Sequence, residues 1–400
     1  MVTLDQIYHA SYVLRDVARK TDMIEAAALS SLTDCSLFLK TENLQLTGSF
    51  KLRGAYYKIS KLSEEQRKAG ILACSAGNHA QGVALAASRA GLRAVICMPD
   101  GAPMTKVEAT KGFGAEVVLV KGGYDDAYAH ACRLRNETGM TFIHPFDDDE
   151  VIAGQGTIGL EILDQLPDVD IVLVPVGGGG LLSGVAYAIK SLNPKVKVFG
   201  VQAENAASMQ RSLQAGTPLT LERAGTFADG IAVRHPGERT FAMCRQWADG
   251  ILTVTEDEIA AAILALMEKQ KMIAEGAGAV GLAAVLAKKL DTQGKKVCCL
   301  ISGGNIDVNI LSRVVTRGLM TTGRRVTLQI ALEDKPGQLV DVSRIVADCG
   351  ANVISVVHNI GNAGTAVTSC TLTLGLETRD AAQIAEIRQK LGEAGFELVE

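Results

Sequence analysis

Short apolar segments alternate with amphipathic or alanine-rich helical segments along most of the chain. The predicted strands, apolar on both faces, cover residues 36–40, 71–74, 94–98, 116–120, 170–176, 196–201 and 296–301. The predicted helices among them include residues 52–61, 154–165, 181–191, 258–270 and 278–289. Because parallel strands are buried on both faces and joined by helices, this alternation predicts two open α/β sheets covered by helices.

Two other stretches give different patterns. Residues 3–32 are predicted to form two helical stretches. Residues 203–255 are the least regular part and contain turn formers such as Pro218 and Pro236. Loops over a site and loops at a subunit contact both fit this segment, and the sequence leaves the two open.

The pattern changes again from Arg324 onward. It predicts, in chain order, strand 325–332, helix 338–349, strand 352–360, a hairpin at 361–364, strand 365–374, helix 379–394 and strand 396–400. This βαββαβ order is that of a ferredoxin-like unit, and its length suits a small independent domain. Gly318 to Gly323 is the predicted linker.

Composition and charge indicate an ordinary globular protein that binds small molecules. Of its 400 residues, 48% are hydrophobic and 21% are charged, and the net charge of -4 gives no reason to expect nucleic acid or a membrane as partner. The chain starts without a basic and apolar leader and has no apolar run of about 18 residues, so a cytoplasmic location is expected. The nine scattered cysteines are expected to be reduced and buried.

Lys51 is the first candidate for chemistry. It follows the Gly48-Ser49 turn and stands where the predicted helix 52–61 begins. The helix dipole and burial both disfavour the ammonium form, and an unprotonated amine can form a Schiff base with an aldehyde cofactor. Taken alone, the motif is more typical of a solvated surface lysine than of a catalytic one.

Two glycine-containing turns at strand ends are candidate anion sites. Ser75-Ala76-Gly77-Asn78-His79 opens an alanine-rich helix, so its N–H groups could hold a carboxylate and Asn78 could reach a ring hydroxyl. Simple helix capping is the alternative. Gly177 to Gly180 brings backbone amides to a helix start, which favours a phosphate. The dinucleotide fingerprint does not fit, although Glu204 after the next strand keeps a nucleotide interpretation open.

Two more turns add polar groups. Ser302, in Ser302-Gly303-Gly304-Asn305, could hydrogen-bond a ring nitrogen or could cap a plain turn. Glu275 precedes a predicted helix, where it could orient a ligand or only favour the helix terminus. The side chains of His79, His144 and His235 lack metal-ligand spacing and are interpreted as structural.

These motifs, in this order, resemble the fold-type II pyridoxal-phosphate enzymes, most closely the threonine ammonia-lyase (threonine dehydratase) family, and the tail resembles an ACT domain. The resemblance implies a large cofactor-binding domain of residues 1–52 and 146–318, a small domain of 53–145, a linker at 319–324 and a regulatory domain of 325–400. It implies catalytic roles for Lys51 and Ser75. The implied cofactor-binding residues are Phe50, Lys51, Asn78, Gly177, Gly178, Gly179, Gly180, Leu181, Glu275, Ser302 and Gly303, and the implied substrate-binding residues are Ser75, Ala76, Gly77, Asn78 and His79.

The resemblance also implies a reaction. Lys51 would bind pyridoxal phosphate and later remove the Cα proton, after which β-elimination turns L-threonine into 2-oxobutanoate and ammonia, or L-serine into pyruvate as a side activity. A neutral Ser302 at the ring nitrogen makes a weaker electron sink than a carboxylate, which favours prompt elimination. Serine racemases carry a serine where this chain has Ala76, which argues against racemisation. No metal is assigned: Glu204 could match one acidic ligand of that family, but Gln210 stands at a second.

For the ACT-like tail, the resemblance implies isoleucine or valine bound at an interface between two such domains, near Pro336, Gly337 and Asn352. A homotetramer is expected. A tail that serves only oligomerisation is the alternative. Competing functions are a serine ammonia-lyase or racemase of the same fold, a non-catalytic amino-acid-sensing module and, more remotely, a nicotinamide dehydrogenase.

Overall fold

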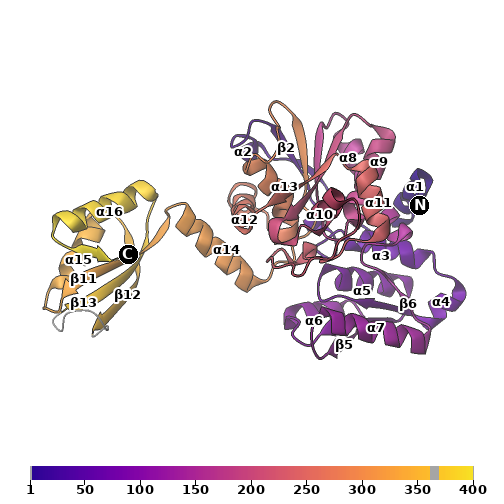
Figure 1. The fold of residues 1–400 in the computed structure, drawn as a ribbon, viewed down its shortest axis with the longest axis horizontal. Helices are drawn as coiled ribbons and strands as arrows, with labels where there is room; N and C mark the ends of the chain where they lie inside the picture. Colours follow the sequence, from indigo (N-terminus) through magenta and orange to yellow (C-terminus); the bar gives the residue numbers. More distant parts are fainter. Residues whose placement is uncertain (1, 361–368, 400) are drawn as a thin grey trace. The chain divides into compact units, whose positions relative to one another are not determined.

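The computed structural model of the protein describes residues 2–360 and 369–399. The chain divides into two compact units, Met1–Asp307 and Val308–Glu400. Figure 1 follows the chain through both units. In the described part of the chain, no helix is long and apolar enough to cross a membrane.

The larger sheet of the N-terminal unit has six strands in the order β1-β2-β10-β7-β8-β9. All neighbouring pairs are parallel except β1 with β2. The strands are β1 (Met23–Glu25), β2 (Ser36–Lys40), β7 (Ile171–Pro175), β8 (Lys197–Ala203), β9 (Gly250–Val254) and β10 (Lys296–Leu300). Val297 to Leu300 are fully buried, as expected for a central strand covered on both faces.

The smaller sheet of this unit is parallel and has the order β5-β4-β3-β6. Its strands are β3 (Ile71–Cys74), β4 (Ala94–Pro99), β5 (Glu116–Val120) and β6 (Thr141–Phe142). In Figure 1 this sheet forms one lobe with the helices α5, α6 and α7. These two sheets, parallel apart from the β1–β2 pair, confirm the predicted α/β class.

Helices connect and cover these strands. They are α1 (Leu4–Leu14), α2 (Ala27–Ser30), α3 (Lys51–Ser60), α4 (Glu64–Ala69), α5 (Asn78–Ala90), α6 (Met104–Gly112), α7 (Tyr124–Thr138), α8 (Asp149–Gln165), α9 (Gly180–Leu192), α10 (Ser208–Ala215), α11 (Glu238–Trp247), α12 (Glu256–Gln270) and α13 (Gly276–Leu286), with the short 3-10 turns η1 (Glu42–Leu44), η2 (Glu204–Ala206) and η3 (Asp229–Ile231).

Helix α3 packs against α5 of the lobe with the smaller sheet and against α8 of the lobe with the larger sheet, and close backbone contacts hold it there. A Cβ added at Gly154 of α8 would lie 2.6 Å from the carbonyl oxygen of Arg53, and one at Gly82 of α5 would lie 2.9 Å from the carbonyl carbon of Lys51. Neither site has room for a side chain, so glycines on two neighbouring helices set the position of α3. The start of α3, which carries Lys51, is therefore fixed from both lobes.

A buried ionic cluster anchors the same helix. The Arg53 guanidinium donates to both carboxylate oxygens of Glu42, at 2.9 and 2.8 Å, and to Glu161 at 2.6 and 3.0 Å. Lys40 donates to Glu161 at 2.6 Å. Burial disfavours the ionised form of Glu42, but Arg53 and Lys40 outweigh it and hold the pKa of Glu42 below its ordinary value.

The C-terminal unit begins with α14 (Val308–Thr321) and continues as β11 (Arg325–Glu333), α15 (Gln338–Asp348), β12 (Asn352–Ile360), β13 (Ser369–Glu377), α16 (Ala381–Glu393) and β14 (Glu397–Val399). Its antiparallel sheet has the order β12-β13-β11-β14. Leucines of β13 and β11 pack under α15 and α16 in one apolar cluster. The predicted βαββαβ order is confirmed; the predicted hairpin at 361–364 and the first residues of the predicted strand 365–374 lie outside the described residues.

Several sequence predictions of elements were wrong. The second helical stretch predicted in 3–32 contains β1 and only the short α2. The segment 203–255 contains α10, α11 and β9, although it was expected to be mostly loops. Strand β6 was not predicted, and the predicted linker is helical as far as Thr321.

Candidate active site

A cavity of about 870 Å³ lies in the N-terminal unit where β3, β7 and β10 end. It is lined by fourteen residues that the sequence analysis selected: Phe50, Lys51, Ser75, Ala76, Gly77, Asn78, His79, Gly177, Gly178, Gly179, Gly180, Leu181, Glu275 and Ser302. Ligands of open α/β sheets bind at this edge. The four turns, far apart in the sequence, thus meet around one space.

Lys51 is the first residue of α3, and its side chain is held by a carbonyl group. Nζ donates to the backbone oxygen of Pro145 at 2.9 Å and lies 5.2 Å from the centre of the Phe50 ring. Burial lowers the pKa of Lys51 to about 8, against the opposing effect of the Glu275 charge. A useful share of the amine is therefore unprotonated near neutral pH, as imine formation requires.

Glu275 is a buried carboxylate in the wall of the same cavity as Lys51. It is 3% exposed, and burial together with the charge of Asp229 raises the pKa of Glu275 to about 7. A Cβ added at Gly303 would lie 2.4 Å from Glu275 Oε1. Gly303, which the sequence analysis placed in the site, therefore makes room for this carboxylate.

Asn78 connects two parts of the site. Its Nδ2 donates to Glu275 Oε1 at 2.6 Å, and its Oδ1 accepts from Asn305 Nδ2 at 2.8 Å. Asn305 also donates to the carbonyl of Thr47 at 2.8 Å, just before the Lys51 turn. These bonds fix the orientation of the Asn78 amide.

The loop from Ser75 to His79 presents donors to the cavity. The Gly77 N–H donates to Ser75 Oγ at 3.2 Å. The N–H groups of Ala76, Asn78 and His79 have no hydrogen-bond acceptor among the described residues. Backbone donors left without an acceptor at the start of a helix suit a bound carboxylate.

The glycine loop forms a second donor cradle. Gly179 has φ of +97°, and a Cβ there would lie 2.5 Å from Met209 Cε, whereas one at Gly178 would lie 2.4 Å from the Phe146 ring. Within residues 2–360 and 369–399, the N–H groups of Gly177 through Leu181 donate no hydrogen bond. Unpaired donors at the start of α9 fit a phosphate.

Ser302 is buried beside the Lys51 turn, and the three histidines are held by hydrogen bonds within the protein. Ser302 is 2% exposed, and its carbonyl accepts from Phe50 N at 3.2 Å. His79 Nε2 donates to the carbonyl of Ile143 at 2.9 Å. Burial, with a smaller effect of Lys51, lowers the pKa of His79 to about 3, so its ring is neutral. His235 lies against Thr220 at 3.0 Å, and His144 Nδ1 accepts from the Asp147 N–H at 2.8 Å.

Three features of the site could not be assigned a role from the sequence. Gln155 lines the cavity, and its Oε1 is buried without a partner among the described residues. Asn305 belongs to the predicted Ser302 turn, but its hydrogen bond to Asn78 is visible only in the structure. Lys106 forms an ion pair of 2.5 Å with Asp229 on the cavity wall.

The remaining predicted residues lie elsewhere. Glu204 is exposed in η2, and the Gln210 side chain donates to the carbonyl of Ile251 at 2.9 Å. Gly337 stands before α15 with φ of +99°, and Asn352 at the start of β12 donates to Glu377 at 3.0 Å.

The donor set fits pyridoxal phosphate: an amine of lowered pKa for the aldehyde, a backbone cradle for the phosphate, and a buried serine for the ring nitrogen. Lys51, Gly177 to Leu181 and Ser302 would hold those three groups. The fit rests on the unpaired donors of the cradle and on the absence of space for any Cβ at Gly178 and Gly179.

Comparison with known proteins agrees with this geometry. A family profile described as pyridoxal-phosphate dependent enzyme matches residues 14–303. The chain is 51% identical to an L-threonine ammonia-lyase of Thermotoga maritima over 398 residues, covering 100% of this chain and 99% of the relative. An L-threonine ammonia-lyase of Geobacter sulfurreducens is 42% identical over 396 residues, covering 99% and 98%.

A solved structure supports the same assignment. The processed form of threonine deaminase isoform 2 from Solanum lycopersicum superposes with a TM-score of 0.75 at 41% identity, covering 78% of this chain and 92% of that one. These matches confirm the predicted fold and the dependence on pyridoxal phosphate. The chain therefore belongs to the pyridoxal-phosphate-dependent enzymes, as a member of the threonine ammonia-lyase family.

Proposed function

We propose that this enzyme converts L-threonine into 2-oxobutanoate and ammonia, and L-serine into pyruvate as a side activity, in the cytoplasm. The observation that carries the proposal is the Lys51 amine, whose pKa is lowered to about 8, in a cavity lined by Ser75, Gly178 and Ser302. The threonine ammonia-lyase of Thermotoga maritima, 51% identical, supports the choice of substrate.

Each part of the cavity has one task in this proposal. Bound pyridoxal phosphate supplies the electron sink for breaking the Cα–H bond. The free N–H groups of Ala76, Asn78 and His79 hold the substrate carboxylate. Lys51 would hold the cofactor through its aldehyde until the substrate amine replaces it, and the freed Nζ would then accept the Cα proton.

The rest of the reaction follows from these contacts. The β-hydroxyl leaves as water after gaining a proton, and the released enamine takes up water and loses ammonia, which leaves the 2-oxo acid. The net change is the loss of ammonia from the amino acid. The methyl group that distinguishes threonine from serine is worth only about 1–3 kcal/mol, so both are substrates.

Two residues favour elimination over racemisation. A neutral hydroxyl at Ser302 does not hold the ring nitrogen protonated as a carboxylate does, so a carbanion is poorly stabilised and the leaving group departs. Ala76 offers no second base on the opposite side of the substrate.

A regulatory role of the C-terminal unit belongs to the same proposal, with isoleucine or valine as effector and a homotetramer as the assembly. The strand register supports a site shared between copies. Glu333, at the end of β11, lies opposite Ser369, whereas Asn352 lies opposite Glu377, at the other end of β13. A site that contains both the Pro336-Gly337 turn and Asn352 therefore takes them from two chains.

The test is 2-oxo acid formation from both substrates by the wild type, Lys51→Ala and Lys61→Ala, with and without isoleucine. Lys61 directly follows the last residue of the same helix but is exposed, so it is the matched control. Lys51→Ala should lose about 100- to 10,000-fold in kcat and the visible absorbance of the lysine-bound cofactor. Full activity in Lys51→Ala would overturn the proposal and favour a sensing module or another chemistry.

A further inference from the structure

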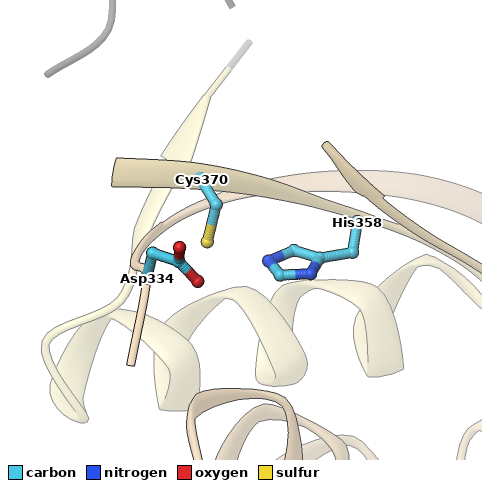
Figure 2. Close-up of side chains that lie close together, drawn as sticks. All are labelled: Asp334, His358 and Cys370. Atoms are coloured by element: carbon cyan, nitrogen blue, oxygen red, sulfur yellow. The ribbon is translucent and has the colours of Figure 1, made fainter. Parts of the chain in front are cut away.

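Three side chains of different chemistry meet in the C-terminal unit, far along the chain from the active-site residues. They are Asp334, His358 and Cys370, and one ligand atom from each lies within 4.8 Å of the other two. Figure 2 shows the Asp334 carboxylate and the His358 ring on either side of the Cys370 sulfur. No other such group of three occurs among the residues that the structure describes.

The strand register explains why they meet. On β13, Cys370 lies opposite Leu332 of β11 and opposite Ile360 of β12. His358 lies opposite Leu372, two residues beyond Cys370, and directly opposed residues of antiparallel strands point to the same face. Cys370 and His358 are thus diagonal neighbours on one face of the sheet.

Asp334 completes the group from the turn after β11. Glu333, the last residue of that strand, pairs with Ser369, so Asp334 emerges beside the start of β13. The three ligands therefore come from two strands and one turn, at one end of the sheet. Within residues 2–360 and 369–399, no hydrogen bond or ion pair engages any of the three side chains.

The donor set selects the kind of ion. A thiolate, an imidazole and a carboxylate are the three ligand types of zinc, whereas Mg²⁺ and Ca²⁺ prefer oxygen alone. Tetrahedral bonds of about 2.0 to 2.3 Å place ligand atoms about 3.5 Å apart. The three ligand atoms lie within 4.8 Å of one another, so rotation about side-chain bonds that moves each atom by about 1 Å would bring them to bonding distance from one ion.

We propose that Asp334, His358 and Cys370 form a zinc site with a fourth position open to water. The exposed side chains of Asp334 and His358 give the ion a way in, while Cys370 provides a buried anchor that is 4% exposed. Bound zinc would tie the β11–α15 turn, which carries Pro336 and Gly337, to both strands. The inference goes beyond the proposed function and does not depend on it.

A catalytic interpretation of the same three residues fits less well. A nucleophilic cysteine has to be reached by its substrate, and the Cys370 side chain is nearly inaccessible. An ion needs only one open side, which the exposed Asp334 and His358 leave.

The test is metal binding by the full-length holoenzyme in metal-free buffer. Zn²⁺ content per chain is measured after dialysis, and Co²⁺ is titrated as a spectroscopic substitute whose thiolate absorbance reports a sulfur ligand. We expect one ion per chain, a thiolate band with Co²⁺, and no binding of Mg²⁺. Cys370→Ala and His358→Ala should each weaken Zn²⁺ binding at least about 10-fold.

Cys349→Ala is the matched control, since Cys349 is another buried cysteine of the same apolar cluster. It should bind Zn²⁺ as the wild type does. His358→Ala changes an exposed side chain and keeps the test valid if Cys370→Ala does not fold. A Co²⁺ complex without the thiolate band, or equal Zn²⁺ binding by the wild type and His358→Ala, would show that the ion binds elsewhere and would overturn the proposal.

Discussion

Asn78 Nδ2 and Glu275 Oε1 are joined by a hydrogen bond of 2.6 Å between residues 197 positions apart in the chain. The bond connects the first turn of α5 with the residue before α13. It holds a buried carboxylate in the cavity that also contains the Lys51 amine. The protonation states of Glu275 and Lys51 are therefore linked, because the charge of Glu275 raises the pKa of Lys51.

This link predicts a pH effect of Glu275→Gln. The substitution removes the charge that raises the pKa of Lys51, so that pKa should fall below its wild-type value of about 8. A fall of about half a unit would increase the unprotonated amine about 3-fold at pH 7. The measurement is the rate at which cofactor-free protein binds pyridoxal phosphate from pH 6 to about 9, the range around this pKa.

Glu137→Gln is the control for this prediction, because Glu137 is exposed on α7 and does not line the cavity. Its pH midpoint should equal that of the wild type. An unchanged or higher midpoint in Glu275→Gln would mean that Glu275 is not ionised beside Lys51.

The glycine loop predicts a loss of cofactor affinity in Gly178→Ala. The added methyl group would lie 2.4 Å from the Phe146 ring, so either the loop or the ring must move. Overpacking of this kind costs about 1–3 kcal/mol, which corresponds to an affinity about 5- to 150-fold weaker. Fluorescence titration of cofactor-free protein with pyridoxal phosphate measures the change.

Gly225→Ala provides the comparison, since a Cβ at Gly225 meets no atom within 4 Å and its φ is not positive. Its affinity should stay within about 2-fold of the wild type, as for an ordinary surface substitution. If Gly178→Ala binds pyridoxal phosphate equally well, the cradle is not where the phosphate lies.

The four turns of the active site could be predicted because each depends on local sequence. Lys51, Gly178 and Ser302 follow short apolar strands, and the ends of parallel strands meet at one edge of a sheet. Gln155 could not be found in this way. It lies within a long helix, and only the packing of α8 against α3 turns it toward the cavity.

The missed elements have a similar explanation. Met23 to Glu25 is too short to show a strand pattern and becomes β1 only by pairing with β2. Gly250 to Val254 lies in the segment 203–255, whose glycines and prolines indicate loops, and its pairing with β8 comes from the tertiary fold. Local propensity is a weak guide where tertiary contacts decide.

The role of Arg53, like those features, cannot be predicted from the local sequence. In sequence it looks like an ordinary helix arginine, but it is 2% exposed and bonded to Glu42 and Glu161. Arg53→Met would leave the fully buried Glu42 without its main cation, which should cost about 3–5 kcal/mol of unfolding free energy. Arg93→Met is the control, because the Arg93–Glu116 pair is exposed and screened by water and salt, so its loss should change the unfolding free energy far less.

The cost of Arg53→Met should depend on pH in a defined direction. In the wild type the pKa of Glu42 is lowered, so its contribution to stability is present above its ordinary value of 4.5 and is lost as the pH falls through the lowered value. In Arg53→Met the largest effects that lower the pKa of Glu42 are gone and only Lys40 and Thr21 oppose burial, so that pKa should rise, and acid should neutralise Glu42 and remove the penalty. The difference in unfolding free energy between the wild type and Arg53→Met should therefore become smaller from pH 7 toward about pH 4.

The measurement of this difference is urea unfolding followed by the fluorescence of Trp247, the single tryptophan of the chain. A gap that does not change with pH, or one no larger than that of Arg93→Met, would show that the buried pair does not stabilise the start of α3.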